Sequence, residues 1–526
     1  MDSQAKTMTR RAVVSSFIFK FPPNRGPQVA LFRRSDKVRT YPNRLAPVSG
    51  SIEKDDPSPL DAAWREIREE TTLTPATLTL LRQGKDYRFA DDKIGREWTI
   101  HPFAFRLKSH EDESRIQIDW EHQGFQWFEP HEVRDVDEFG GVPRLAESLR
   151  RIWFEIELGE SRAKVLSEGL LALQHDHGSG ARVLAARALD VFLSLVSDKS
   201  GFDKDGSVDN WWRNIRLAAW HLWKNGRECM GAAILNNIVR SLAVIEKEVQ
   251  KAKDDRTPPK FLERVTQKVR NLAVARGSSV DGIWRSFEAF LQQQQQQQSS
   301  GRPIRILTLS SSSTILQCLQ RAVAGFDSDF DIRILESRPL FEGVSMASGL
   351  VNRLREAPAE RKNKVEVSIY TDAGAAVASR DVDIVLIGAD AIDRYGSTYN
   401  KTGSLPAVLS AKHCSPHSKV LVLADSEKIL PYEMPDWEVN DIDELATSWK
   451  QSPSVKGTVS TLLGSAPGMT TDEKGVKVGV MNVYFEWVPP TLIDGYLFED
   501  GQKSAKDIAD LADKIRREAD AFFSDV

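Results

Sequence analysis

Three glutamates in one short segment are the residues of this chain best suited to chemistry. Glu66, Glu69 and Glu70 belong to the run R-E-I-R-E-E, and a helix places them at i, i+3 and i+4 on one face. Carboxylates so close raise one another's pKa unless a divalent cation binds through their oxygens. The spacing therefore indicates metal-assisted phosphate chemistry, although many acidic helix faces are simply solvated.

The helix that would carry these glutamates is predicted independently. Ser58 suits the N-cap position, Pro59 suits the first turn, and Asp61 stands where a capping-box acid reaches back to the helix start. The three carboxylates are therefore expected to share one ridge.

Residues 50–73, which read GSIEKDDPSPLDAAWREIREETTL, resemble the Nudix box, whose core is R-E-U-x-E-E-x-G-U. Pro57 stands where that box has a further glutamate. The nearby acids that can replace it are Glu53, Asp55 and Asp56.

Thr72 stands where the Nudix box has glycine after the last glutamates. A β-branched residue costs roughly 1–2 kcal/mol to hold in the left-handed conformation that glycine adopts freely. We therefore expect the end of this helix to be rebuilt.

Segments 11–19, 29–33 and 98–105 read as strands, and 125–130 resembles the strand-to-helix segment that closes a Nudix domain. The resemblance implies an α/β/α sandwich with a mixed sheet over residues 1–143. It also implies hydrolysis of a nucleoside diphosphate derivative such as ADP-ribose, by water attacking phosphorus, with Glu66 and Glu69 in catalysis. The implied ligands of Mg²⁺ or Mn²⁺ are Glu66, Glu69, Glu70 and Glu121.

Composition bounds the remaining possibilities. The chain has 526 residues, is 41% hydrophobic and 28% charged, and carries a formal net charge of −4, which gives no reason to expect direct nucleic-acid binding. Cys229, Cys318 and Cys414 are widely spaced, as expected in a reducing cytosol without a disulfide framework or zinc site. No apolar run approaches the roughly 20 residues of a membrane span. We expect a cytoplasmic protein without membrane contact.

Three further parts follow the first domain. Residues 144–290 are rich in helical periodicity and predict a helical domain. The run Gln292–Gln298 predicts a flexible polyglutamine linker over 291–303. Residues 304–526 alternate apolar strands with helical segments, which predicts a Rossmann-like domain with a parallel sheet covered on both faces. The expected strands are 304–309, 332–335, 365–370, 384–387 and 420–423.

The residues that follow these strands are small and polar, and in such sheets ligands bind beyond the carboxyl ends of the strands. Hydroxyl groups, a lysine and helix starts gathered there make a phosphate cradle, although each loop alone reads equally as an ordinary helix cap. Taken together they resemble one superfamily, which contains the alpha, beta and delta subunits of translation initiation factor 2B, methylthioribose-1-phosphate isomerase and ribose-1,5-bisphosphate isomerase. The matching blocks are E-S-R-P (336–339), G-A-D (388–390), N-K-x-G (400–403), A-D-S-E-K (424–428) and N-V-Y-F-E-W-V-P (482–489).

This second resemblance runs from about residue 150 onward and implies binding of a phosphorylated sugar or nucleotide. It places Arg338 and Lys401 at phosphate and Asp390 at the sugar. It further implies a homodimer formed through the last domain, and it allows a translation-factor partner. The remaining ligand-binding positions that it implies are Asn400, Gly180 and Lys428.

The isomerases of this superfamily use a cysteine after the first sheet strand together with the aspartate of G-A-D. Here Ser310 and Asp390 stand at these catalytic positions. A hydroxyl is a far weaker acid than a thiol, whose pKa is near 8.5, so proton-transfer chemistry does not transfer readily. We therefore expect binding without isomerisation.

Two alternatives stay open. In the first, the second module is a regulatory or assembly protein and the Nudix part is a nucleotide sensor. In the second, both modules are active, and the phosphorylated ribose released by the first is isomerised by the second. Ser310 favours binding alone, whereas Asp390 favours the two-step enzyme.

Overall fold

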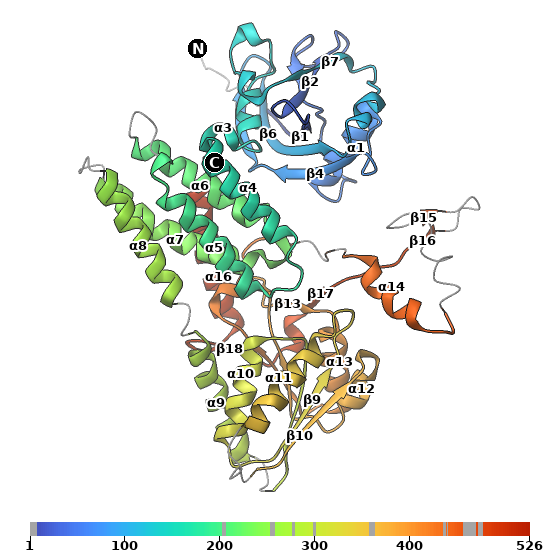
Figure 1. Ribbon diagram of the computed structural model, residues 1–526, viewed down its shortest axis with the longest axis vertical. Helices are drawn as coiled ribbons and strands as arrows, with labels where there is room; N and C mark the ends of the chain where they lie inside the picture. Colours follow the sequence, from blue (N-terminus) through green and yellow to red (C-terminus); the bar gives the residue numbers. More distant parts are fainter. Residues whose placement is uncertain are drawn as a thin grey trace, which may run out of the picture.

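The computed structural model describes residues 8–201, 207–252, 258–275, 279–297, 301–356, 363–434, 438, 440–455, 470–471 and 477–526. Figure 1 shows a sheet domain at one end, a helical bundle in the middle and a second sheet domain at the other end. The overall α/β class predicted from the sequence is confirmed.

The N-terminal domain is built on a mixed sheet. The long strand β1 (Thr9–Lys20) pairs antiparallel with β2 (Gln28–Arg34) and parallel with β6 (Arg96–Leu107). The remaining strands of this sheet are β3 (Leu45–Ala46), β4 (Leu78–Gln83), β5 (Tyr87–Asp91) and β7 (His122–Phe128).

One helix covers each face of this sheet, which confirms the sandwich. Helix α1 (Pro59–Thr71) buries Ile67 against one face, while Leu149 of α2 (Leu145–Arg150) packs with Phe17 on the other. Because α2 completes this second face, the domain continues beyond residue 143.

Helix α1 begins as predicted, since the Ser58 side chain accepts a hydrogen bond from the Asp61 backbone N–H. The expected rebuilding of its end is wrong. Thr72 itself holds the left-handed conformation, with φ of 61° and ψ of 1°. Its N–H donates to the Arg68 carbonyl and its hydroxyl donates to the Arg115 carbonyl at 3.1 Å, and these bonds offset the backbone strain.

The helical region predicted between the two sheets is present. Its helices are α3 (Glu155–Leu158), α4 (Glu160–Gln174), α5 (Ala181–Ser197), α6 (Val208–Lys224), α7 (Gly231–Ala252) and α8 (Pro258–Ala275). Within the described ranges, one helical stretch, Glu228–Ala252, is long and apolar enough to cross a membrane by length and composition. Its most apolar window is 78% buried inside the fold, as a central bundle helix would be.

The flexible polyglutamine linker is a wrong prediction for the residues that the structure describes. Helix α9 (Ser279–Gln297) includes the glutamine run through Gln297, and Gln298 lies outside the described residues. Ile283, Phe287 and Leu291 are fully buried at helical spacing against the C-terminal sheet. Glutamine is a good helix former, so the run extends a helix that this packing has already fixed.

The C-terminal sheet has the order β10-β9-β8-β11-β14-β18-β19, and its pairs are parallel except β18 with β19. Its strands are β8 (Ile304–Leu309), β9 (Phe330–Leu335), β10 (Val365–Tyr370), β11 (Ile384–Ile387), β14 (Lys419–Leu423), β18 (Gly495–Phe498) and β19 (Gly501–Lys503). All five strands predicted from the sequence are present. The helices of this domain are α9, α10 (Ser313–Gly325), α11 (Glu342–Glu356), α12 (Ala375–Ala378) and α13 (Ser404–Cys414).

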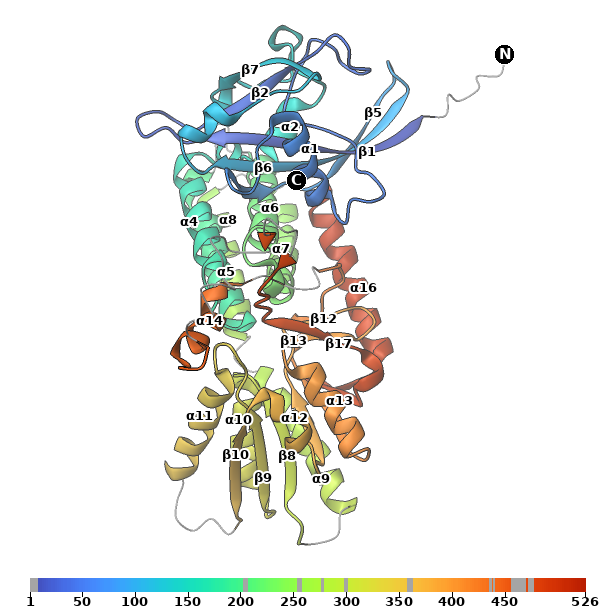
Figure 2. The same ribbon diagram turned by 90° about the vertical axis from the view of Figure 1, so that its right-hand side faces the viewer.

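Further elements lie between or beside these parts. A small sheet of β12 (Ala391–Ile392), β13 (Thr398–Lys401) and β17 (Phe485–Val488) lies between the bundle and the C-terminal sheet, with α14 (Ile442–Gln451) to one side (Figure 2). The short strands β15 (Thr470–Thr471) and β16 (Lys477–Val478) pair with each other. Helix α16 (Ala505–Phe522) runs from the C-terminal sheet past the bundle to the underside of the N-terminal domain.

Candidate functional sites

A cavity of about 500 Å³ opens on the N-terminal sheet beside α1. Glu66, Glu69 and Glu121 line it, so the structure brings three of the four predicted metal ligands to one cavity. Glu70 does not line it and is only 3% exposed. The catalytic and ligand roles of these glutamates stay predictions.

Arg65 organises the helix face beneath the cavity. Its Nε and Nη2 donate to the two Asp56 carboxylate oxygens at 3.0 and 2.9 Å, and its Nη1 donates to Glu66 at 2.7 Å. Of the three acids proposed to replace the missing glutamate, Asp56 is therefore the one that contacts Arg65. These bonds lower the pKa of Asp56, while burial raises the pKa of Glu66.

Glu70 lies under the cavity against His122 on β7. His122 Nε2 is 3.3 Å from a Glu70 oxygen, and His122 Nδ1 is 3.4 Å from Asp119. Burial, followed by the charges of Glu66 and Glu121, raises the pKa of Glu70 well above its usual value. Burial lowers the pKa of His122, so the environment of this pair disfavours the charged form of both groups.

The donor set fits a hard divalent cation in its chemistry. The groups are carboxylate oxygens that repel one another, and Glu70 Oε2 is buried without a hydrogen-bond partner. Across the described part of the chain, however, no three histidine, cysteine or acidic side chains converge as a preformed metal site. Glu66 is engaged by Arg65, and the Glu69 side chain is 54% exposed. A cation would therefore compete with Arg65 for Glu66.

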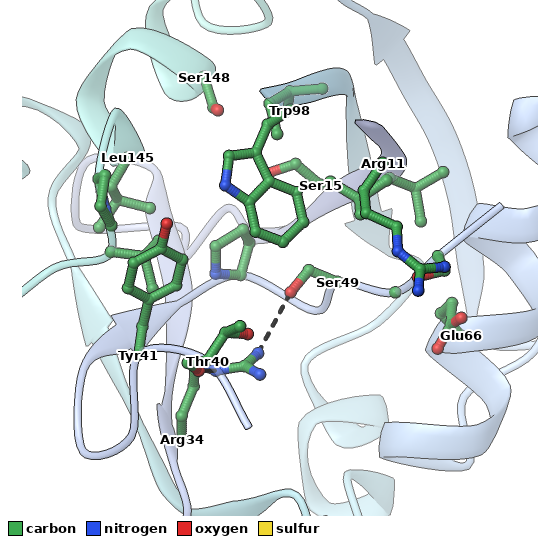
Figure 3. A pocket seen from close by; sticks show the side chains of 18 of the residues that line it. Arg11, Ser15, Arg34, Thr40, Tyr41, Ser49, Glu66, Trp98, Leu145 and Ser148 are labelled. Carbon is green, nitrogen blue, oxygen red and sulfur yellow. Dashed lines mark hydrogen bonds between the residues drawn. The ribbon is translucent and has the colours of Figure 1, made fainter. Parts of the chain in front are cut away.

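The other walls of the cavity are cationic and aromatic (Figure 3). Arg34 Nη1 approaches Ser49 Oγ at 3.5 Å, and Arg11 faces Glu66. Trp98 lies between them, with its ring centroid 6.4 Å from that of Tyr41. Sequence reasoning missed these walls, because residues from β1, β2 and β6 meet there only after the sheet has formed.

In the C-terminal domain, the predicted catalytic position Ser310 follows β8 in a left-handed conformation, with φ of 63°. Its N–H donates to Ser337 Oγ at 2.7 Å. The Asp372 carboxylate accepts from the N–H groups of Ser337 and Arg338 at 2.9 and 2.7 Å. The loops after β8, β9 and β10 are therefore tied together, as expected at the carboxyl edge of a parallel sheet.

Lys401 and Arg338, the two residues predicted to contact phosphate, differ in burial and in their partners. Lys401 is buried, with Nζ 2.5 Å from Glu342 Oε1 and 4.2 Å from the Tyr484 ring centre. Arg338 is exposed and donates to Ser448 Oγ on α14 at 2.7 Å. The two cations are therefore held by separate partners.

The remaining predicted ligand positions lie on neighbouring segments. Lys428 Nζ is 3.9 Å from Asp390 Oδ1. Asn400 Nδ2 donates to Ser404 Oγ at 2.8 Å, and a side chain on Gly388 would lie 3.4 Å from Asn400 Oδ1. Gly180 is exposed at the start of α5. The structure gives these positions, and the roles of all of them stay predictions.

The loop that precedes Gly180 approaches this region. His177 and Tyr484 have ring centroids 6.5 Å apart, and Tyr484 is the ring beneath Lys401. The bundle therefore contributes to the same region as the C-terminal sheet.

Sequence reasoning missed a buried cluster from the bundle. Arg227, 3% exposed, pairs with Glu438 at 2.9 Å and donates to the Asp176 carbonyl at 2.7 Å. Beside it, burial raises the pKa of the Cys229 thiol, and the charges of Glu438 and Asp390 act in the same direction. No sequence pattern joins residues about 200 positions apart, so this cluster could not have been found by spacing.

Individual relatives match the second module in part. A methylthioribose-1-phosphate isomerase of Leptospira interrogans is 28% identical over 173 residues, which are 32% of this chain and 42% of the relative. A putative translation initiation factor eIF-2B subunit 2-like protein of Pyrococcus horikoshii is 26% identical over 196 residues, 37% and 56% of the two chains. The chain therefore spans about half the length of these relatives.

Among solved structures, a chain of the tetrameric eIF2B-beta2-delta2 complex from C. thermophilum is similar at 16% identity and a TM-score of 0.46. The match covers 69% of this chain and 98% of that one.

Two family models match the chain. The NUDIX domain model matches residues 10–152, and the model of the initiation factor 2 subunit family matches residues 179–504. The second match covers well over half of the chain, so this protein belongs to the initiation factor 2 subunit family and carries a NUDIX domain ahead of the region that defines that family.

Proposed function

We propose that the N-terminal domain is a Mg²⁺- or Mn²⁺-dependent hydrolase that cleaves the phosphoric anhydride of a nucleoside diphosphate derivative such as ADP-ribose. One observation carries this proposal: carboxylates, arginines and aromatic rings line a single cavity. A diphosphate needs cations around its oxygens, and a nucleobase stacks well on an aromatic ring.

Each wall of the cavity has a part in the proposed reaction. When bound to Glu66, Glu69, Glu70 and Glu121, the cation supplies Lewis-acid stabilisation and a lowered pKa for an attacking water. Arg11 and Arg34, which line the same cavity, neutralise phosphate oxygens, and Glu121 takes a proton from water where it is not a ligand of the cation. Asp56 holds Arg65 in place, and Arg65 orients Glu66.

The test is a panel of nucleoside diphosphate sugars, dinucleotides and nucleoside triphosphates incubated with the full-length protein and Mg²⁺. Phosphorus NMR of the products distinguishes cleavage between the two phosphorus atoms from loss of a terminal phosphate. Release of a nucleoside monophosphate supports the proposal. No turnover of any compound with either metal would reject it.

We further propose that the second module binds a phosphorylated sugar or nucleotide and does not isomerise it. The supporting observation is the buried Lys428, whose Nζ is 3.9 Å from Asp390, together with the buried Lys401 and with serine in the position of a catalytic thiol. Binding needs the cations, whereas proton transfer between carbon atoms needs a group with a suitable pKa.

Calorimetry on the full-length protein tests binding to this second site with probes that contain no phosphoric anhydride for the first domain to cleave. Ribose 1,5-bisphosphate, AMP and hexose phosphates are suitable probes, and Lys401→Met is the matched loss-of-binding variant. An NMR assay for ketose formation tests whether the second module isomerises the bound sugar phosphate. Rapid turnover that Asp390→Asn abolishes would instead establish the two-step enzyme.

A further inference from the structure

Helix α2 forms one wall of the N-terminal cavity, although it lies far beyond α1 in the sequence. Leu145 and Ser148 line the cavity together with Tyr87 of β5. The Tyr87 hydroxyl donates to the Arg144 carbonyl at 3.2 Å and lies 2.7 Å from Ser148 Oγ. The position of this wall therefore depends on how α2 is held.

Arg151, the residue after α2, contacts two residues of that region, Tyr87 and Glu147. Its guanidinium carbon is 4.6 Å from the Tyr87 ring centre, and its Nε donates to Glu147 at 2.9 Å. Its Nη1 also donates to the Lys85 carbonyl at 3.3 Å. Arg151 is only 4% exposed, so these partners replace water as its hydrogen-bond acceptors.

The same guanidinium contacts the second module. Its Nη1 donates to the carbonyl of Val526, which is fully buried. Val526 belongs to the short segment 523–526 after α16, the helix that reaches the underside of the N-terminal domain from the C-terminal sheet (Figure 2). One side chain therefore touches both a wall of the N-terminal cavity and segment 523–526 of the second module.

A second arginine anchors that segment at a distance from the cavity. Arg216 of α6 donates to the Phe522 carbonyl at 3.0 Å and forms an ion pair with Asp525. Arg216 does not line the cavity. It is therefore a place where the segment can be loosened without touching the substrate.

We propose that Arg151 is a positioning residue that makes the shape of the N-terminal cavity depend on the docking of segment 523–526. The inference rests on the proposed hydrolase and adds its regulation: the second module holds the wall that faces the substrate. Loosening the segment removes one hydrogen-bond partner of the buried Arg151 guanidinium. The same guanidinium also contacts Glu147 of α2 and the Tyr87 ring, so the cavity wall is expected to move with it. The proposed chemistry at Glu66 and Glu69 lies on another wall and is not disturbed.

The test uses the full-length protein with Arg216→Gln and Arg151→Met, and with Arg150→Gln as the matched control. Arg150 is the neighbouring arginine and also pairs with Glu147, but it contacts neither Tyr87 nor Val526 in the described structure. Hydrogen exchange of the peptides that cover residues 85–88 and 145–151 is measured beside the steady-state kinetics.

We expect about tenfold faster exchange of both peptides in Arg216→Gln and Arg151→Met, because their local opening becomes easier. We also expect KM to rise about fivefold with kcat within about twofold, since binding geometry is lost and chemistry is not. The control should match the unsubstituted protein in both measurements.

Unchanged exchange and unchanged KM in Arg216→Gln would overturn the inference, even if Arg151→Met fails to fold. An equal effect of Arg150→Gln would also overturn it, because the contact with segment 523–526 would then not be the cause. Faster exchange in a protein that hydrolyses nothing would keep the mechanical link and reject the proposed hydrolase. The two failures are therefore distinguishable.

Discussion

Asn225 and Gln83 exchange two hydrogen bonds across the junction between the N-terminal domain and the bundle. The Gln83 N–H donates to Asn225 Oδ1 at 2.7 Å, and Asn225 Nδ2 donates to the Gln83 carbonyl at 2.9 Å. An asparagine side chain thus completes the backbone pairing at the end of β4. Because both bonds are needed, the amide orientation is fixed, and Nδ2 also faces His221 Nδ1 at 2.8 Å.

Acid should loosen this junction through His221. Burial, together with the charge of Arg82, lowers the pKa of this fully buried imidazole well below 6.5, and protonation would turn the Nδ1 acceptor into a donor facing Asn225. The native state then binds fewer protons than the unfolded state, so the free energy of unfolding falls as pH drops below 6.5, until pH reaches the lowered pKa.

The expected loss from His221 alone is about 1.4 kcal/mol for each pH unit below 6.5. Urea unfolding of the unsubstituted protein and of His221→Gln is measured at pH 7.5, 6.5 and 5.5. The difference between the two pH profiles gives the loss of unfolding free energy that is due to His221. Other histidines titrate equally in both proteins. Parallel pH profiles would show that His221 does not report on the junction.

The buried face of α9 and its glutamine run should respond differently to shortening of their side chains. Leu291→Ala is expected to lower the free energy of unfolding by about 2–5 kcal/mol, because Leu291 is fully buried. Gln293→Ala should change it by less than about 0.5 kcal/mol, since alanine keeps the helix and Gln293 is exposed. Chemical denaturation measures both. A small effect of Leu291→Ala would restore the linker interpretation of residues 291–303.

Thr72→Gly should be nearly neutral, within about 1 kcal/mol, because relief of left-handed strain is offset by a lost hydrogen bond and a more flexible unfolded chain. Hydrolysis should persist in this variant. The neighbouring Thr71→Gly is the contrast, since Thr71 is buried inside α1 and donates to the Ile67 carbonyl. Thermal unfolding should separate them by several degrees; equal midpoints would contradict the assigned helix end.

Local signals predicted much of the fold. The capping residues Ser58, Pro59 and Asp61 marked the start of α1, and apolar runs marked the strands of the parallel sheet. Both are encoded within a few residues, so sequence alone carries them. The glutamine run was misread because its composition suggested disorder. Its structure is set instead by Phe287 and Leu291, which lie on the buried face of α9 just before the glutamines.

The candidate sites could be predicted only in part, for a related reason. Glu66 and Glu69 share a helix, so their spacing was informative. Trp98 and Arg34 reach the same cavity from different strands, and Arg227 meets Glu438 across the bundle. Such pairs depend on tertiary packing, and no local pattern encodes them. The hydrogen bond from Arg151 to the Val526 carbonyl joins residues still further apart in the sequence.

The central claim is metal-dependent hydrolysis at the carboxylates of α1, and one measurement tests it most directly. The rate of cleavage of a nucleoside diphosphate derivative is measured with Mg²⁺ and again after a chelator is added. It is also measured in the variants Glu69→Gln and Glu70→Gln, and Glu111→Gln is the control because Glu111 is exposed. We predict loss of at least about 100-fold on chelation and in both variants, because each removes the cation or a charged oxygen ligand. The control should keep full activity, whereas full activity in Glu69→Gln and Glu70→Gln would contradict the account.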